Sequence, residues 1–277
     1  MKKIIVPVDF SEYSEYALEA AAAIAREHDS EILVMHMLEI SEAVLNTGDL
    51  EQGEKAVFFL KIAEKKFETF LDKPYLEGLT VTPVVKHFKV FSELAEVAAS
   101  HSVDLIVMGS KGASGFSEIF VGSNTEKVVR HSDVPVLVVK EKLANVEFNN
   151  AVFACDFSSK TYGVYKKAMS LFKAMKVTPH ILYVNLPSDS FRNSDEIEEK
   201  ITNFLNKTDG NLDQKDNVAV VNDYTVEGGV FNYANKINAD LIAVATHGRT
   251  GFLHFFEGSI SEDIANHASL PVLTFKI

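Results

Sequence analysis

The sequence predicts an α/β protein made of two tandem copies of one unit, each with a parallel β-sheet. Its 277 residues are about twice the length of a typical domain. Short β-branched runs alternate with stretches of helical periodicity, which implies parallel strands, right-handed crossovers and a covered sheet. One uncommon glycine pattern also occurs twice, and such self-similarity is the mark of internal duplication.

The first copy opens with the β-branched run Lys3 to Val8, which Asp9-Phe10-Ser11 interrupts. A helix follows, because apolar or small residues from Tyr13 to Ile24 recur at i, i+3, i+4 and i+7. The same criteria predict, in order, a strand at Glu31 to Met37, a helix at Glu51 to Leu71, a strand at Val81 to Phe88, a helix at Ser92 to Ser100, a strand at Asp104 to Met108, a helix at Ser123 to His131 and a strand at Val134 to Lys140.

The second copy repeats this order with a shorter middle. Asp156 matches Asp9 at an offset of 156 − 9 = 147, whereas Asp240 matches Asp104 at an offset of 240 − 104 = 136. The second copy is therefore 147 − 136 = 11 residues shorter, and we expect most of the loss after the second strand, where Glu39 to Leu50 has a reduced counterpart at Leu186 to Asn193. The polar stretch Glu141 to Asn150 is interpreted as a linker, which gives domains at residues 1–142 and 147–277.

Composition narrows the classes of partner. A formal charge of −12 argues against nucleic acid, whose phosphates would be repelled. An anionic ligand must then be held by local amides, with a divalent cation such as Mg²⁺ as a further source of positive charge. The single cysteine excludes an internal disulfide framework and fits a reducing compartment. No apolar stretch approaches the roughly 18 residues that span a bilayer, so we expect a cytoplasmic protein without membrane contact.

The duplicated glycine pattern carries the chemistry. In the first copy a strand ends in Gly109-Ser-Lys-Gly112, and after nine residues Gly122-Ser123 opens a helix with Ser-x-x-Glu spacing. In the second copy the corresponding strand ends in Ala245-Thr-His-Gly248, and Gly258-Ser259 follows after nine residues. Glycines let a backbone approach a ligand, and the free N–H groups at a helix start favour anions. The pattern predicts phosphate binding in both copies.

Together these features resemble the universal stress protein family. The resemblance rests on Gly-x2-Gly-x9-Gly-Ser after a strand, on Pro7-Val-Asp9-Phe-Ser at the end of the first strand, and on the closing Val-Pro135-Val-Leu-Val-Val; it covers nearly the whole chain as two copies. It implies a Rossmann-like, doubly wound, five-stranded parallel sheet of order 3-2-1-4-5 in each copy. It also implies ATP binding in some members, at the point where strands 1 and 4 diverge.

The resemblance assigns roles to residues of the first copy. Pro7 belongs to the motif that ends the first strand, Asp9 would accept hydrogen bonds from the ribose or adenine, and Met37 would line the adenine pocket. The phosphate side would be formed by the glycine loop and the following helix start: Gly109 against the ribose, Gly112 against the phosphates, and Gly122, Ser123 and the Asn124 amide completing the cradle. Lys111 would add a cationic contact.

The second copy keeps most of this set, namely Asp156, Gly248, Gly258 and Ser259, with His247 and Arg249 as further phosphate donors. It departs from the pattern at Ala154, where the first copy has proline, and at Ala245, where it has glycine. We expect the Ala245 methyl to intrude where the backbone should approach the sugar, or to be strained if the position needs a positive φ. The second site therefore ranks after the first.

Structural roles compete with these assignments. Ser123 and Ser259 are also typical N-caps, with Glu126 and Glu262 closing capping boxes, and such glutamates compete with phosphate. Asp9 and Asp156 could instead cap the helices that follow them. Cys155 is expected to fill the core rather than to react. The nine histidines lack metal-ligand spacing, so we expect no dedicated metal site.

The sequence therefore predicts a stress-response protein that binds ATP or a related adenine nucleotide as a regulatory or structural ligand. Neither a Walker lysine motif nor a nucleophile elbow is present, and no base to orient water is evident, so we assign no catalytic residue and expect slow hydrolysis at most. A weak nucleotide-using enzyme and a scaffold that acts through protein partners without nucleotide are the alternatives. The resemblance further implies an internal pseudo-dimer through the last strand of each copy, at Val136 to Val139 and Val272 to Phe275, and a homodimer remains an option.

Overall fold

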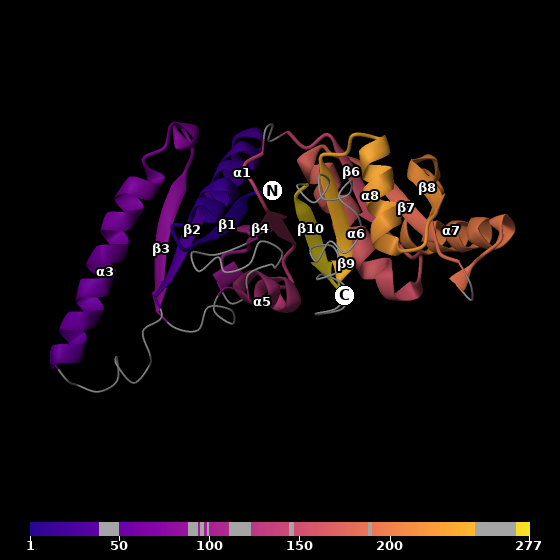
Figure 1. The fold of residues 1–277 in the computed structure, drawn as a ribbon. Coiled ribbons are helices and arrows are strands. Elements are labelled where there is room, and N and C mark those ends of the chain that lie inside the picture. The colour runs from indigo at the N-terminus through magenta and orange to yellow at the C-terminus, as the bar shows by residue number, and fades with distance from the viewer. Residues whose placement is uncertain are drawn as a thin grey trace. The chain divides into compact units, whose positions relative to one another are not determined.

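The computed structural model of the chain describes residues 1–38, 50–87, 94, 97–98, 100–110, 123–143, 147–187, 190–246 and 270–277. The chain divides into two units, Met1–Val146 and Glu147–Ile277. The boundary between them falls within the stretch Glu141 to Asn150 that was interpreted as a linker. Each unit is an α/β fold with a parallel sheet, as predicted (Figure 1).

Unit 1 contains five parallel strands in the order β3-β2-β1-β4-β5. Its elements are β1 (Lys3–Val8), α1 (Glu12–His28), β2 (Glu31–Leu38), α3 (Leu50–Leu71), a 3-10 helix at Pro74–Leu76, β3 (Val81–His87), β4 (Leu105–Gly109), α5 (Ser123–His131) and β5 (Val136–Val139). Every residue of β4 and β5 is buried, as expected for parallel strands with helices on both faces. The helix expected at Ser92 to Ser100 lies mostly outside the described residues, of which Leu94, Val97, Ala98 and Ser100 are helical.

Unit 2 repeats the topology, with strand order β8-β7-β6-β9-β10. Its elements are β6 (Asn150–Ala154), the 3-10 helix η2 (Ser159–Thr161), α6 (Tyr162–Met175), β7 (Thr178–Asn185), α7 (Ser194–Thr208), a 3-10 helix at Lys215–Asn217, β8 (Val218–Asn222), α8 (Val226–Lys236), β9 (Leu241–Thr246) and β10 (Val272–Lys276). Numbered within its own unit, each sheet has the predicted order 3-2-1-4-5.

One carboxylate in each unit ties the amino ends of the two central strands together. The Asp104 Oδ2 atom accepts hydrogen bonds from the backbone N–H groups of Lys2 (2.5 Å) and Lys3 (3.1 Å). The Asp240 Oδ2 atom accepts the same pair from Asn149 and Asn150, both at 2.9 Å. These bonds satisfy backbone donors at the amino ends of the strands, opposite to the ends at which Gly109 and Ala245 lie.

The difference in length between the two copies falls mainly in a helix, which corrects the expectation that it falls in the connection after the second strand. Helix α3 has 22 residues and its counterpart α7 has 15, so seven of the eleven residues are lost there. Figure 1 shows the longer helix α3 running alongside the edge strand β3. Its exposed apolar side chains are Val57, Phe58, Phe59 and Ile62.

Candidate functional site

Each sheet has a point where consecutive connections leave in opposite directions. In unit 1 the chain passes from β1 to β2 on one side and from β4 to β5 on the other, and β1 and β4 are neighbours. In unit 2 the strands β6 and β9 stand in the same relation. Ligands of open α/β sheets bind at the carboxyl ends of strands at such a switch point. Asp9 and Gly109 lie there in unit 1, and Asp156 and Ala245 in unit 2.

The turn after the first strand has one conformation in both units. Phe10 has a φ of 66° and Phe157 a φ of 51°, which is the left-handed region that non-glycine residues seldom occupy. Immediately before each, an aspartate accepts a hydrogen bond from the backbone two residues on: Asp9 from Ser11 at 3.0 Å and Asp156 from Ser158 at 2.9 Å. Such an aspartate turn fixes the direction in which the chain leaves the strand.

Packing of the phenylalanine rings holds this unusual backbone in place. The Phe10 ring centroid lies 4.4 Å from that of His36 on β2 and 5.1 Å from that of Phe67 on α3. The Phe157 ring lies 6.1 Å from Tyr183 on β7 and 5.1 Å from Phe204 on α7. Each ring therefore joins the second strand and the second main helix of its unit beneath the switch point.

Neither aspartate is the helix cap that the sequence left as an alternative. The N-cap of α1 is Ser11, whose hydroxyl accepts from the Ser14 N–H, and the Asp9 carboxylate accepts from that same hydroxyl at 2.5 Å. In unit 2 Asp156 accepts from the Thr161 hydroxyl at 3.1 Å, and Thr161 is the N-cap of α6. Each aspartate thus accepts from the hydroxyl of the residue at the N-cap position; the Ser11 hydroxyl also caps its helix, whereas the Thr161 hydroxyl makes no capping bond.

Packing requires a glycine at position 109, for a reason that the sequence did not reveal. A Cβ atom at this position would lie 2.7 Å from the Tyr13 carbonyl oxygen and 2.8 Å from its carbon, closer than real contacts allow. Its φ is not positive, so the requirement is for space and not for a left-handed backbone. The glycine lets helix α1 approach the end of β4 whether or not a sugar binds. The condition given for strain at Ala245, a positive φ, is not met, since Ala245 lies within the extended strand β9.

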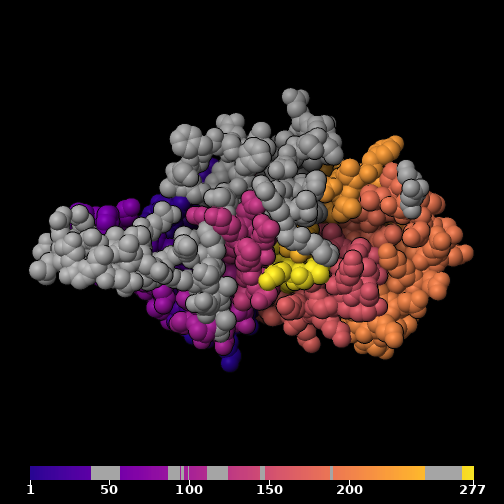
Figure 2. All heavy atoms as spheres, turned by 90° about the horizontal axis from the view of Figure 1, so that it is seen from below, coloured from indigo at the N-terminus to yellow at the C-terminus, as the bar shows by residue number. Residues whose placement is uncertain are grey.

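A cavity of about 470 Å³ lies at the switch point of unit 2. Drug-sized and cofactor ligands occupy pockets of about 300–1,000 Å³, so this volume suits a nucleotide-sized molecule. The residues that line it are Ala154, Cys155, Asp156, Thr161, Leu182, Tyr183, Val184, Leu186, Ser190, Arg192, Lys200, Val226, Val244, Ala245 and Ile277. Ala245 thus borders the cavity without filling it. Ile277 is 39% exposed, and Figure 2 shows the yellow carboxyl-terminal segment at the surface.

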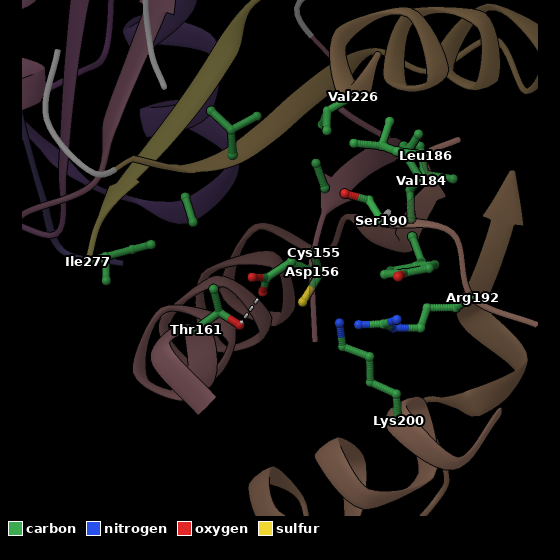
Figure 3. Close-up of a pocket in the computed structure, with 15 residues that line it drawn as sticks. Cys155, Asp156, Thr161, Val184, Leu186, Ser190, Arg192, Lys200, Val226 and Ile277 are labelled. Atoms are coloured by element: carbon green, nitrogen blue, oxygen red, sulfur yellow. Dashed lines mark hydrogen bonds between the residues drawn. The ribbon is translucent and has the colours of Figure 1, made fainter. Parts of the chain in front are cut away.

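Two cations face this cavity that the sequence reading missed. Figure 3 shows Arg192 and Lys200 extending toward the side where Cys155 and Asp156 lie. The Lys200 ammonium sits 5.2 Å from the centroid of the Tyr183 ring. Burial raises the pKa of the Tyr183 phenol, and the charge of Arg192 opposes that rise, so both cations act at this one ring. The Lys200 position has a counterpart in unit 1, where the Lys66 ammonium lies 5.3 Å from the Phe10 ring.

The Cys155 thiol lines the cavity but is unreactive. It is buried, and burial raises its pKa to about 12. A thiol with this pKa is almost wholly protonated at neutral pH and is a poor nucleophile. Its N–H contact comes from Phe157, 3.4 Å from the sulfur, so it supports the turn.

The remaining residues assigned from the sequence fall into two groups. Met37 and Pro7 lie on β2 and β1, and Asn124 is exposed in the first turn of α5, which Ser123 opens. The buried Thr125 hydroxyl donates to the Gly109 carbonyl oxygen at 2.8 Å and ties α5 to β4. The glycine-loop residues lie outside the described part of the chain: Lys111, Gly112, Gly122, His247, Gly248, Arg249, Gly258, Ser259 and Glu262.

Comparison with known proteins identifies the family. The sequence model of the universal stress protein family matches residues 1–140 and again residues 147–276. The chain belongs to the universal stress protein family. The two matches make it a tandem, two-domain member, as the duplication predicted.

Individual universal stress proteins match one copy or both. MJ0531 of Methanocaldococcus jannaschii is 33% identical over 150 residues, which is 50% of this chain and 82% of that protein. MJ0577 of the same organism is 31% identical over 157 residues, 51% of this chain and 96% of that protein. A solved universal stress protein from Archaeoglobus fulgidus covers 99% of this chain and 96% of its own, with 25% identity and a TM-score of 0.58. A two-copy arrangement therefore exists in a related structure.

The helices that the structure describes include none with the length and apolar character needed to cross a membrane.

Proposed function

We propose that this universal stress protein binds ATP or a related adenine nucleotide as a regulatory or structural ligand. The observation that carries the proposal is the cavity of about 470 Å³ at the switch point of unit 2, bordered by Asp156. The repeated turn supports a site at the same place in unit 1, where the complete glycine pattern made the sequence prediction strongest. The proposal assigns no catalytic residue and places the protein in the cytoplasm, where its free thiol is stable.

The donor set fits the parts of a nucleotide. A carboxylate suits the hydroxyl donors of a ribose or the amino group of adenine, and apolar residues such as Leu182 and Val184 suit the base. The phosphates would lie toward the glycine loop and helix start, where amide donors and Mg²⁺ would offset their charge. Bound ATP would stabilise the native state by mass action and need not be consumed.

Replacing each aspartate by asparagine tests the two sites separately. One asparagine oxygen still accepts the hydrogen bonds that hold the turn, while the second carboxylate oxygen and the negative charge are lost. We expect Asp9→Asn to weaken Mg-ATP binding in unit 1, and Asp156→Asn in unit 2, by about tenfold to a hundredfold, because a hydrogen bond to a charged group contributes roughly 1.5–3 kcal/mol. Isothermal titration of the full chain measures both affinities.

The matched control is Asp104→Asn, with Asp240→Asn in unit 2, at the opposite ends of the same sheets. These variants remove carboxylates that bond only to backbone in the contacts above, so they should leave ATP affinity unchanged. Unaltered affinity in Asp9→Asn and Asp156→Asn would contradict the proposed sites. No detectable ATP binding by the unmodified chain would contradict the function itself.

A specific observation favours a second candidate, a stress scaffold that works through protein partners. Helix α3 exposes Val57 (51%), Phe58 (61%) and Phe59 (46%), and clustered exposed aromatic residues are typical of interaction surfaces. The scaffold function would be supported if the unfolding temperature of the chain did not change with millimolar Mg-ATP.

The internal pseudo-dimer is also part of the proposal. Strands β5 and β10 close their sheets with the apolar sequences Val-Leu-Val-Val and Val-Leu-Thr-Phe, which would be exposed templates for aggregation if left unpaired. Pairs of cysteines introduced one in each strand should cross-link under oxidation. A complete scan without a cross-link would contradict the pairing, and sedimentation would separately report a homodimer.

A further inference from the structure

The cavity of unit 2 carries an excess of positive charge on an acidic chain. Its lining includes one acidic side chain, Asp156, and two basic side chains, Arg192 and Lys200, whereas the whole chain has a formal charge of −12. Within the described residues, neither cation forms an ion pair. Asp156 is engaged by the Ser158 N–H and the Thr161 hydroxyl. Glu196, an acid four residues after Arg192, is engaged as the capping-box partner of the Asn193 N–H at 2.9 Å.

The main chain of Arg192 is held by a buried side chain. The Asn185 oxygen accepts from the Arg192 N–H at 3.0 Å, and the Asn185 amide donates to the Arg192 carbonyl at 3.2 Å. Asn185 is only 4% exposed, and its amide also donates to Asn222 at 2.9 Å. The main chain of Arg192 is therefore tied to the ends of β7 and β8, and its exposed side chain lines the cavity.

Unit 1 does not carry this arginine. Its connection from Glu39 to Asp49 contains no lysine or arginine and has three acidic residues, Glu39, Glu42 and Asp49. The lysine is common to both units, as Lys66 and Lys200. A feature confined to unit 2 indicates a ligand preference that differs between the copies.

We propose that the cavity of unit 2 selects a nucleotide that carries a phosphate on its ribose, in addition to the 5′-phosphate, and that Arg192 and Lys200 bind this phosphate. The inference rests on the proposed function, which places the sugar beside Asp156. A carboxylate beside a ribose recognises its hydroxyls, and an adjacent arginine accommodates a phosphate ester on the same sugar. Arg192 supplies the planar, two-pronged donor set that phosphate oxygens accept, and Lys200 supplies a second positive charge.

The test compares AMP with adenosine 2′,5′-bisphosphate and adenosine 3′,5′-bisphosphate by isothermal titration of the full chain. We expect at least one bisphosphate to bind unit 2 about tenfold more tightly than AMP, and the two bisphosphates distinguish which ribose hydroxyl carries the group. Arg192→Gln and Lys200→Gln should each lower the affinity for the preferred bisphosphate more than the affinity for AMP, and so remove most of this preference. Arg192→Gln keeps its backbone bonds to Asn185, so the fold should persist, and far-ultraviolet circular dichroism checks this.

The matched control is Lys66→Gln, which alters the corresponding lysine of unit 1 and should leave the preference intact. Equal affinity for AMP and both bisphosphates would overturn the inference while leaving the proposed function standing. A preference that survives in both Arg192→Gln and Lys200→Gln would also overturn it. Failure of all three nucleotides to bind would overturn the proposed function together with the inference.

Discussion

The two units place the same residue types around the same turn but distribute the hydrogen bonds differently. In unit 1 the Ser11 hydroxyl donates to Asp9 and accepts from Ser14, and α1 begins directly at Glu12. In unit 2 the aspartate bonds the Thr161 hydroxyl instead, and the buried Ser158 hydroxyl has no hydrogen-bond partner among the described residues. A turn can thus be kept through duplication while the group that it orients changes.

The helix that follows explains the glycine difference between the copies. The Tyr13 backbone of α1 occupies the space that a Cβ at Gly109 would need. The residue in the place of Tyr13 in unit 2 is Lys160, which lies in the 3-10 helix η2, and α6 begins only at Tyr162. Ala245 is present where the α-helix starts later. Helix packing therefore explains the glycine of the family pattern, in addition to any role that it has in ligand binding.

Removing the phenylalanine of each turn should give the largest difference in stability between the two units. Phe157 is 4% exposed, so Phe157→Ala should cost about 3–5 kcal/mol of unfolding free energy. Phe10 is only partly buried, and Phe10→Ala should cost about 2 kcal/mol. Urea unfolding of the full chain, followed by circular dichroism, measures both. Equal losses would mean that the rings do not differ in burial as described.

Exchanging the residues at the end of the fourth strand should have an intermediate effect. Gly109→Ala places a methyl group against the Tyr13 backbone, which cannot rotate away, and should cost about 1–3 kcal/mol. Ala245→Gly should cost about 0.5–1 kcal/mol, because glycine only adds freedom to the unfolded chain. The measurement is the same urea titration. If Gly109→Ala left the unfolding free energy unchanged, the packing explanation would be refuted, and a role of the glycine in ligand binding would remain.

Deleting the two serine hydroxyls should give the smallest changes in stability, but changes that differ clearly between the two units. Ser11→Ala removes an N-cap and should cost about 1 kcal/mol. Ser158→Ala removes a buried hydroxyl without a partner and should be neutral or stabilising. Thermal unfolding of the two variants side by side is sufficient. A loss in Ser158→Ala as large as that in Ser11→Ala would indicate a partner for the hydroxyl, such as bound water.

The fold was predictable because its signals are local and occur twice. β-branched runs such as Lys3 to Val8 marked strands, and the second copy confirmed each assignment by its spacing. The place of the length difference was predicted wrongly, since a helix that starts later leaves no composition shift that distinguishes it from a shorter loop. Asp9 and Asp156 were predicted as ligand residues or helix caps and not as turn residues, because their hydrogen-bond partners depend on where the following helix begins.

The candidate site was predictable only in part. Asp156 came from the repeat, but Arg192 lies in the shortened connection, where nothing in the pattern distinguishes it from a solvated charge. Its position depends on Asn185 and Asn222, which meet only when β7 and β8 pair. Lys200 had a usable signal, because Lys66 and Phe70 align with Lys200 and Phe204 at one offset of 134 (200 − 66 and 204 − 70).

The lone thiol of the chain has a practical consequence. Since Cys155 is buried and its pKa is raised to about 12, maleimide reagents should not modify it in the folded protein at neutral pH. Any cysteine added at the surface would then be the only labelling position. Fluorophore pairs can thus be attached, one per unit, without first engineering a cysteine-free background, and the separation of the two halves followed in solution.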